Sequence, residues 1–155
     1  MTVTAVPVRH WGRRYPWNKN YAWTGYVIEY GGVKLVFAGD TAYTTAFREL
    51  AAREKDIDLV MMPIGAYSPD SYQGSHCTPE QAWEMFEDTG AKWLVPIHYD
   101  TFVLSQEPVE EPLQRLLAAA GSEANRHRVV VQTQGGAFQL PRLGVEYEEE
   151  AHSMT

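Results

Sequence analysis

The sequence predicts an α/β fold built on one sheet. Segments of strand length and apolar composition alternate with segments of helical periodicity, which is the pattern of strands layered against helices. The chain also opens with strands joined by a tight turn, so part of the sheet is expected to be antiparallel. At 155 residues, 45% of them hydrophobic and 21% charged, the composition is that of a globular protein with a sizeable core.

The first quarter of the chain is predicted to form three strands. Val3 to Arg9 is the first, and a polar loop from Gly12 to Asn20 follows it. Ala22 to Tyr30 alternates with the period of two that a half-buried strand requires. Gly31-Gly32 is expected to be a tight turn, after which Val33 to Ala38 returns antiparallel.

The middle of the chain is predicted to contain a helix, a strand and a second helix. Apolar residues at helical spacing indicate a short helix from about Thr45 to Lys55, and the continuous apolar run Leu59 to Ile64 indicates a buried strand. A turn-rich loop starting at Gly65 leads to Thr78-Pro79-Glu80-Gln81. This block combines an N-cap threonine, proline at the first helical position and a capping-box glutamine. Gly90 is the expected end of the second helix.

The last part of the chain is predicted to form a strand, a helix and a hairpin. Trp93 to Ile97 has the composition of a buried strand. An apolar stripe from Val109 to Ala120 indicates a helix that ends at Gly121. Val129 to Leu140 is predicted to be a hairpin that turns at Gly135-Gly136.

Domain organisation and composition exclude several classes of protein. We expect residues 1–144 to form one domain and residues 145–155 an acidic, disordered tail. A net charge of −7 without a basic stripe argues against a nucleic-acid partner. Cys77 is the only cysteine, so an internal disulfide is excluded and a reducing, cytoplasmic compartment is expected. The sequence has no signal-peptide pattern and no apolar window near the length of about 18 residues that a transmembrane segment needs.

Four residues of metal-ligand type, His10, Asp40, His76 and His98, lie at strand ends or in the loops that follow strands. Taken singly, each has an ordinary explanation as a hydrogen-bonded loop or turn residue. As a set they favour a metal site, because strand exits converge on one edge of an α/β sheet, where imidazole and carboxylate groups can bind zinc. The two oxygens of Asp40 can also bridge two ions.

Five blocks of sequence resemble the metallo-β-lactamase superfamily when taken in order: Pro7–Trp11, Phe37–Thr41, Pro63–Tyr67, His76 with Thr78–Ala82, and Ile97–Phe102. More narrowly, they are similar to the branch typified by N-acylphosphatidylethanolamine-hydrolysing phospholipase D and by lactonase-like metal-dependent hydrolases. The resemblance extends to about Leu117. It implies the C-terminal half of an αββα sandwich, in which a mixed sheet carries helices on one face.

The resemblance also implies roles for the four residues. His10 would be a ligand of one zinc ion, His98 a ligand of a second, and Asp40 the carboxylate that bridges both. His76 would lie beside the metals as a phosphate contact or a proton donor, so that Asp40 and His76 are the candidate catalytic residues. The His-x-His-x-Asp-His motif that supplies the family's remaining ligands is absent from this sequence and belongs to an N-terminal half.

The implied activity is hydrolysis of a phosphodiester in a small or lipid-like substrate, at a dinuclear zinc site that is incomplete in this chain. Because a catalytic zinc normally has three protein ligands, we expect weak metal binding unless a complementary N-terminal half completes the site. The missing half would leave an apolar sheet face uncovered, which favours self-association. Two alternatives stay open: hydrolysis of a lactone or another ester, and a non-catalytic half that acts by assembling with a complementary chain.

Three aromatic residues, Tyr67, Tyr99 and Phe102, are candidates for lining a lipid- or acyl-accepting cleft. Aromatic residues at strand ends are at least as often part of the core, so core packing is the alternative. Cys77 is expected to be a buried packing residue, since nothing beyond the neighbouring His76 supports a nucleophilic role.

Overall fold

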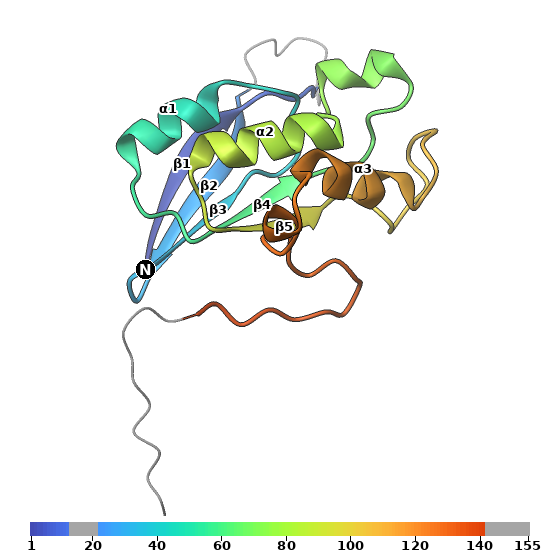
Figure 1. Cartoon of the computed structure of the whole chain (residues 1–155). Coiled ribbons are helices and arrows are strands. Elements are labelled where there is room, and N and C mark those ends of the chain that lie inside the picture. The colour runs from blue at the N-terminus through green and yellow to red at the C-terminus, as the bar shows by residue number, and fades with distance from the viewer. Residues whose placement is uncertain (13–21, 142–155) are drawn as a thin grey trace, which may run out of the picture.

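A mixed sheet of five strands in the order β1-β2-β3-β4-β5 forms the frame of the molecule (Figure 1). The computed structural model describes residues 1–12 and 22–141. The strands are β1 (Thr2–Val8), β2 (Trp23–Tyr30), β3 (Val33–Phe37), β4 (Leu59–Pro63) and β5 (Trp93–Ile97). The five strands predicted between Val3 and Ile97 are therefore confirmed, and the predicted tail and most of the predicted loop before β2 lie outside the described residues.

The directions of the strands determine at which edge of the sheet their carboxyl ends meet. β2 pairs antiparallel with β1 and with β3, whereas β4 pairs parallel with β3 and with β5. Consequently β1, β3, β4 and β5 all run the same way, and their carboxyl ends share one edge of the sheet. The turn between β2 and β3 is the predicted one, because Gly31 and Gly32 both adopt positive φ angles of 57° and 80°.

The longer helices cover one face of the sheet and leave the other without a helical layer, as Figure 1 shows for α1, α2 and α3. The helices are α1 (Ala46–Arg53), the 3₁₀ helix η1 (Asp70–Gly74), α2 (Pro79–Thr89), α3 (Glu111–Ala120) and α4 (Glu123–Arg126). This arrangement confirms the predicted α/β class with helices on one face. None of the described helices is long and apolar enough to cross a bilayer.

Helix α2 begins and ends where the sequence predicts. The hydroxyl of Thr78 accepts the N–H of Gln81 at 3.3 Å, and the Gln81 side chain accepts the N–H of Thr78 at 3.0 Å. Pro79 occupies the start of the helix, and Gly90 ends it in the left-handed conformation with a φ of 67°. All of these signals act within one helical turn, which is why the sequence alone contains them.

The core lies between the sheet and the helices. Strand residues that point toward the helices are fully buried, with Val27, Val36, Val60 and Leu94 at 1% exposure or less. They pack against Phe86 of α2 within one cluster of buried residues. The neighbouring strand residues point to the opposite face, where Tyr26 and others are exposed.

The predicted hairpin from Val129 to Leu140 is wrong. Leu94 donates its N–H to the carbonyl of Arg128 and accepts the N–H of Val130, so this segment pairs in parallel with the outer edge of β5. The N–H of Val130, which a hairpin could use, is thereby taken by β5, and residues 131–140 form no strand, although a turn at Gly135 does form. Sequence reasoning also missed η1 and α4, and it began the α3 stripe at Val109, which lies outside the helix.

Candidate metal centre

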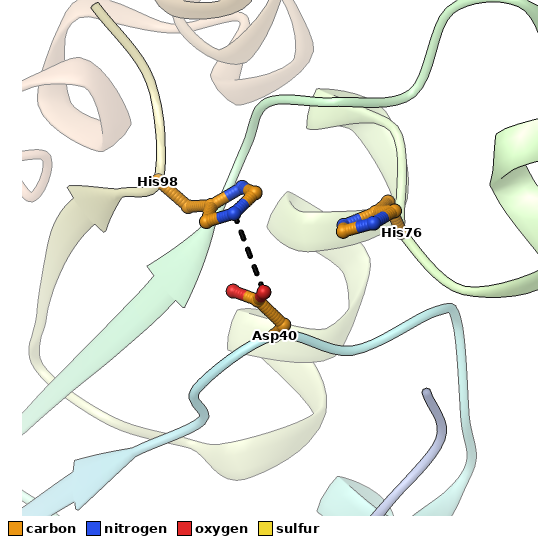
Figure 2. Close-up of side chains that lie close together, drawn as sticks. All are labelled: Asp40, His76 and His98. Carbon is orange, nitrogen blue, oxygen red and sulfur yellow. Dashed lines mark ion pairs between the residues drawn. The ribbon is translucent and has the colours of Figure 1, made fainter. Parts of the chain in front are cut away.

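The four candidate ligands come together at the edge where the parallel-running strands end. His10 follows β1, Asp40 follows β3, and His98 follows β5 directly. His76 lies between η1 and α2, on the long connection that leaves β4. Figure 2 shows Asp40, His76 and His98 with their side chains turned toward a common space. The convergence follows from strand direction, because β1, β3, β4 and β5 deliver their next residues to the same edge.

Distances between side-chain atoms define the cluster. One candidate ligand atom from each of Asp40, His76 and His98 lies within 4.8 Å of the others. Asp40 Oδ2 is 3.3 Å from His98 Nε2 and 3.8 Å from His10 Nε2. The His76 ring stacks on that of His98 with centroids 5.3 Å apart and meets the edge of His10 at 4.9 Å. Asp40 therefore lies between two imidazoles, with His76 completing the group.

A backbone carbonyl orients the ring of His10. His10 Nδ1 lies 2.8 Å from the carbonyl oxygen of Ser75. Because a carbonyl can only accept, Nδ1 carries the proton in the neutral ring and Nε2, which faces Asp40, keeps its lone pair. This is the usual way in which a second hydrogen bond prepares a histidine for metal binding. Ser75 is 65 positions from His10 in the chain, and no sequence signal pairs them.

The backbone around His98 is unusual. His98 itself has a φ of 61°, a left-handed conformation that is uncommon outside glycine and costs of the order of 1 kcal/mol. Gly65 packs so closely against it that a Cβ there would clash with the carbonyl oxygen of His98. The loops after β4 and β5 are thus pressed together at the site, which holds the imidazole of His98 toward Asp40.

Charge within the cluster separates the roles of its members. The hydrogen bond with His98 holds the pKa of Asp40 below its usual value, and the same contact raises the pKa of His98. Burial, followed by repulsion from His10 and His98, lowers the pKa of His76. At neutral pH Asp40 is therefore an anion, and His76 is a neutral imidazole with a free lone pair.

Unpaired ring nitrogens test whether the cluster suits a metal ion. The Nδ1 atoms of His76 and His98 are buried and have no hydrogen-bond partner in the structure. Buried polar atoms are rarely left unpaired, because losing water without replacement costs free energy. Imidazole nitrogens beside an anionic carboxylate are the donor set that zinc and similar divalent ions accept. The residues present therefore fit a divalent metal ion, and elsewhere in residues 1–12 and 22–141 no comparable group of ligand atoms occurs.

Two adjoining cavities open at the site. The first has a volume of about 520 Å³ and contains His10, Asp40, His76 and His98 in its wall. The second has a volume of about 360 Å³ and shares Ala66, His98 and Leu104 with the first. Of the aromatic candidates for an acyl-accepting cleft, Tyr99 and Phe102 line the second cavity. Tyr67 is instead buried, and its hydroxyl donates to Glu111 at 2.7 Å.

Glu107 holds in place, by hydrogen bonds, the backbone beside the wall that the two cavities share. Its carboxylate accepts the N–H groups of Ala66 at 2.6 Å and Ser68 at 3.1 Å, and the hydroxyl of Ser105 at 2.6 Å. Burial alone would raise the pKa of Glu107, but these hydrogen bonds outweigh it and lower the pKa. No pattern in the sequence indicates this role, because the carboxylate lies about 40 residues from the backbone it anchors.

Comparison with known proteins identifies the class to which this fold and site belong. The model of the beta-lactamase superfamily domain matches residues 1–99. The fold resembles the metallo-beta-lactamase fold protein YhfI from Bacillus subtilis, with a TM-score of 0.53, 19% identity and coverage of 74% of this chain and 41% of that one. It also resembles Igni18, a metallo hydrolase from Ignicoccus hospitalis, with a TM-score of 0.53, 23% identity and coverage of 76% and 45%.

The chain belongs to the metallo-β-lactamase superfamily. A relative from Mycobacterium tuberculosis, itself uncharacterized, is 36% identical over 126 residues, which are 79% of this chain and 34% of that protein. The mitochondrial N-acyl-phosphatidylethanolamine-hydrolyzing phospholipase D of Saccharomyces cerevisiae is 30% identical over 122 residues, 74% and 25% of the two chains. These matches confirm the branch that the motifs resemble. The chain spans about a third or less of the length of these relatives.

Proposed function

We propose that this chain supplies one edge of a metal-dependent hydrolase site that cleaves a phosphodiester of a phospholipid-like substrate. The observation that carries the proposal is the meeting of His10, Asp40, His76 and His98 at the rim of a single cavity. Membership of the superfamily and the similarity to phospholipase D relatives support the reaction class. We further propose that residues 1–144 act as one domain and that the protein works in the cytoplasm, with Cys77 as a free thiol.

Asp40, His10 and His98 are the proposed metal-holding residues, with Asp40 shared between two ions. A pair of zinc ions held by these residues in the complete site would supply Lewis acidity and would lower the pKa of water enough to make a nucleophile at neutral pH. Asp40 remains anionic, and its Oδ2 lies 3.8 Å from Nε2 of His10 and 3.3 Å from Nε2 of His98.

His76 is the proposed proton-handling residue. Its ring is half-buried beside the cluster, and its lowered pKa keeps one ring nitrogen able to accept a proton near neutral pH. From its position between His10 and His98, the neutral imidazole can donate its N–H to a phosphate oxygen, or take a proton from the attacking water and pass that proton to the departing oxygen. The structure equally brings a ligand atom of His76 within reach of those of Asp40 and His98, so direct metal binding is the competing role.

The count of ligands leads us to propose that further polypeptide completes the site. Four residues shared between two zinc ions fall short of the three protein ligands that each catalytic zinc normally has. The exposed apolar face of β1, β2 and β3 offers a place for a complementary half-domain to pack, with self-association as the alternative when none is present. A chain that serves only as this structural half, without catalysis of its own, is the second candidate function.

Zinc titration of the purified chain tests the site. We expect weak zinc binding by the unaltered chain and its loss in Asp40→Ala, while His10→Ala and His98→Ala each weaken it in part. Asp88→Ala is the matched control, because it removes a carboxylate that pairs with Arg48 on the surface and should not affect zinc binding. Equal zinc binding by Asp40→Ala and Asp88→Ala would eliminate the proposed centre.

Hydrolysis assays then separate the candidate reactions. A phosphodiester probe, a carboxylic ester and a lactone are compared with the chain alone and with a complementary half taken from a relative. We expect zinc-dependent turnover of the phosphodiester only in the reconstituted sample, and its loss in Asp40→Ala. Preferential turnover of the ester or lactone would replace the phosphodiesterase assignment, and inactivity of a complex shown to bind two zinc ions would favour the structural role.

A further inference from the structure

Large apolar side chains that are exposed in the described part of the chain fall into two groups. One group lies on β1, β2 and β3 or at the first residue: Met1, Val3, Tyr26, Tyr30 and Phe37. The other group, which we name the apolar rim, lines the two cavities at the metal centre: Trp11, Tyr72, Phe102, Val103, Leu104 and Val109. The exposed apolar surface away from the sheet is thus gathered around the mouth of the site.

The centre of the apolar rim is a run of three successive residues, Phe102, Val103 and Leu104. Their exposures of 78%, 88% and 62% mean that most of their apolar surface faces solvent. Three consecutive exposed apolar residues are disfavoured in a loop unless they serve binding. None of the side chains from Thr101 to Gln106, the stretch that contains these three residues, carries a charge.

Hydrogen bonds hold both ends of the loop that carries residues 102–104, the centre of the apolar rim. Gln106 donates its N–H to the carbonyl of Ser68 at 3.0 Å, and Ser105 donates its hydroxyl to Glu107 at 2.6 Å. On the other side, the hydroxyl of Tyr99 donates to the carbonyl of Gln132 at 3.0 Å. The tip between these anchors is therefore presented outward beside the site while its two ends stay in place.

We propose that the apolar rim docks on the surface of a zwitterionic lipid bilayer, with residues 102–104 entering the headgroup layer. Tryptophan and tyrosine with neighbouring aliphatic residues form the composition typical of a membrane interface. The charge of the chain selects the kind of bilayer: the loop from Thr101 to Gln106 is neutral, it is flanked by Asp100 and Glu107, and the net charge is −7. An anionic surface would repel it, and a second copy would bring the same acidic residues face to face.

Docking in this orientation turns the cavity that contains Asp40 and His98 toward the lipid headgroups. The inference deepens the proposed function, on which its biological sense rests, by placing the substrate within a membrane. Binding to vesicles can nevertheless be measured without hydrolysis, so the two proposals fail separately.

Vesicle flotation with a matched pair of variants tests the docking. Val103→Asp changes a rim residue and Val3→Asp makes the same change on the exposed sheet face. With phosphatidylcholine vesicles we expect Val103→Asp to weaken binding roughly tenfold or more, because burying a valine contributes about one factor of ten and a carboxylate opposes it. Val3→Asp should change binding less than about twofold. Added phosphatidylglycerol should weaken the binding of the unaltered chain to the vesicles.

A fluorescent label at the same two positions reports which part of the protein contacts the membrane. Cys77 is 1% exposed, so Val103→Cys and Val3→Cys can each be modified with an environment-sensitive dye at one accessible thiol. The dye at position 103 should shift to the blue with vesicles, and the dye at position 3 should not. Absence of vesicle binding, equal loss in both aspartate variants, or a shift only at position 3 would overturn the docking. Docking by the reconstituted sample without phospholipid hydrolysis would remove the proposed substrate and keep the surface.

Discussion

The two faces of the sheet are both apolar, but in residues 1–12 and 22–141 helices cover only one of them. Val27, Val36 and Val60 point toward the helices and are buried, whereas Tyr26 and Phe37, their neighbours in the same strands, are exposed. An antiparallel sheet with one solvated face normally places polar residues on that face. Here the open face has the composition of an interior, which indicates a surface suited to burial against another layer.

The open face is not uniform across the sheet. Over β5 it is partly covered by the last described segment, since Phe138 packs on Trp93 with ring centroids 4.9 Å apart. Over β1, β2 and β3 the side chains remain exposed. The comparison teaches that packing against the helices already stabilises one face of the sheet. The open face contributes little to the stability of the fold until another layer covers it.

Truncation of one phenylalanine on each face gives the largest expected difference. Phe86 of α2, which packs against the covered face, is 0% exposed, so Phe86→Ala should lower the free energy of unfolding by about 3–5 kcal/mol. Phe37 is 37% exposed on the open face, and Phe37→Ala should cost roughly 1 kcal/mol or less. Urea denaturation of both variants measures the contrast, and equal losses would mean that the open face is already buried in solution.

The capping of two helices on the covered face gives a smaller effect. Thr78 accepts a hydrogen bond from the backbone of Gln81, whereas Thr45 at the start of α1 makes no such bond with its side chain. Thr78→Ala should therefore destabilise the protein by about 1 kcal/mol and Thr45→Ala by much less. Thermal unfolding compares the pair, and a larger loss in Thr45→Ala would contradict the assigned caps.

Glu107, at the edge between the two faces, is expected to make the stability of the protein depend on pH. Its pKa is lowered in the folded protein, so its contribution to stability is complete above the pKa of the unfolded chain and is lost as pH falls through the folded value. Glu107→Gln should destabilise the protein by about 1 kcal/mol at neutral pH, and the difference should shrink below about pH 4.5. Urea titrations at several pH values measure it; a difference that grows in acid would have the wrong sign.

The smallest effect on stability is expected at Tyr30, at the end of β2 on the open face. Tyr30 is exposed, so Tyr30→Ser should change the free energy of unfolding by about 0.5 kcal/mol or less. The same substitution should lower the tendency of the chain to self-associate, because it removes apolar area from the uncovered patch. Sedimentation velocity across a range of concentrations detects this change, and unchanged association would move the contact to another surface.

Local signals made much of the fold predictable. The limits of α2 depend on Thr78, Gln81 and Gly90, all within or beside the helix they control. Strand periodicity and strand exits likewise predicted that His10, Asp40 and His98 would meet at one edge. Their meeting needed no knowledge of distant contacts, because parallel strands deliver their carboxyl ends to the same side of a sheet.

Tertiary structure decided what depends on competition between distant partners. The sequence by itself determined the α/β class, the five strands of the sheet, the caps of α2 and the choice of the four candidate site residues. Only the folded chain showed that Val129 pairs with β5 in place of a hairpin, that Ser75 orients His10, and that residues 102–104 stand exposed beside the site. The physical reason is range: caps and periodicity act over a few residues, whereas pairing, orientation and exposure depend on groups that meet only when the chain has folded.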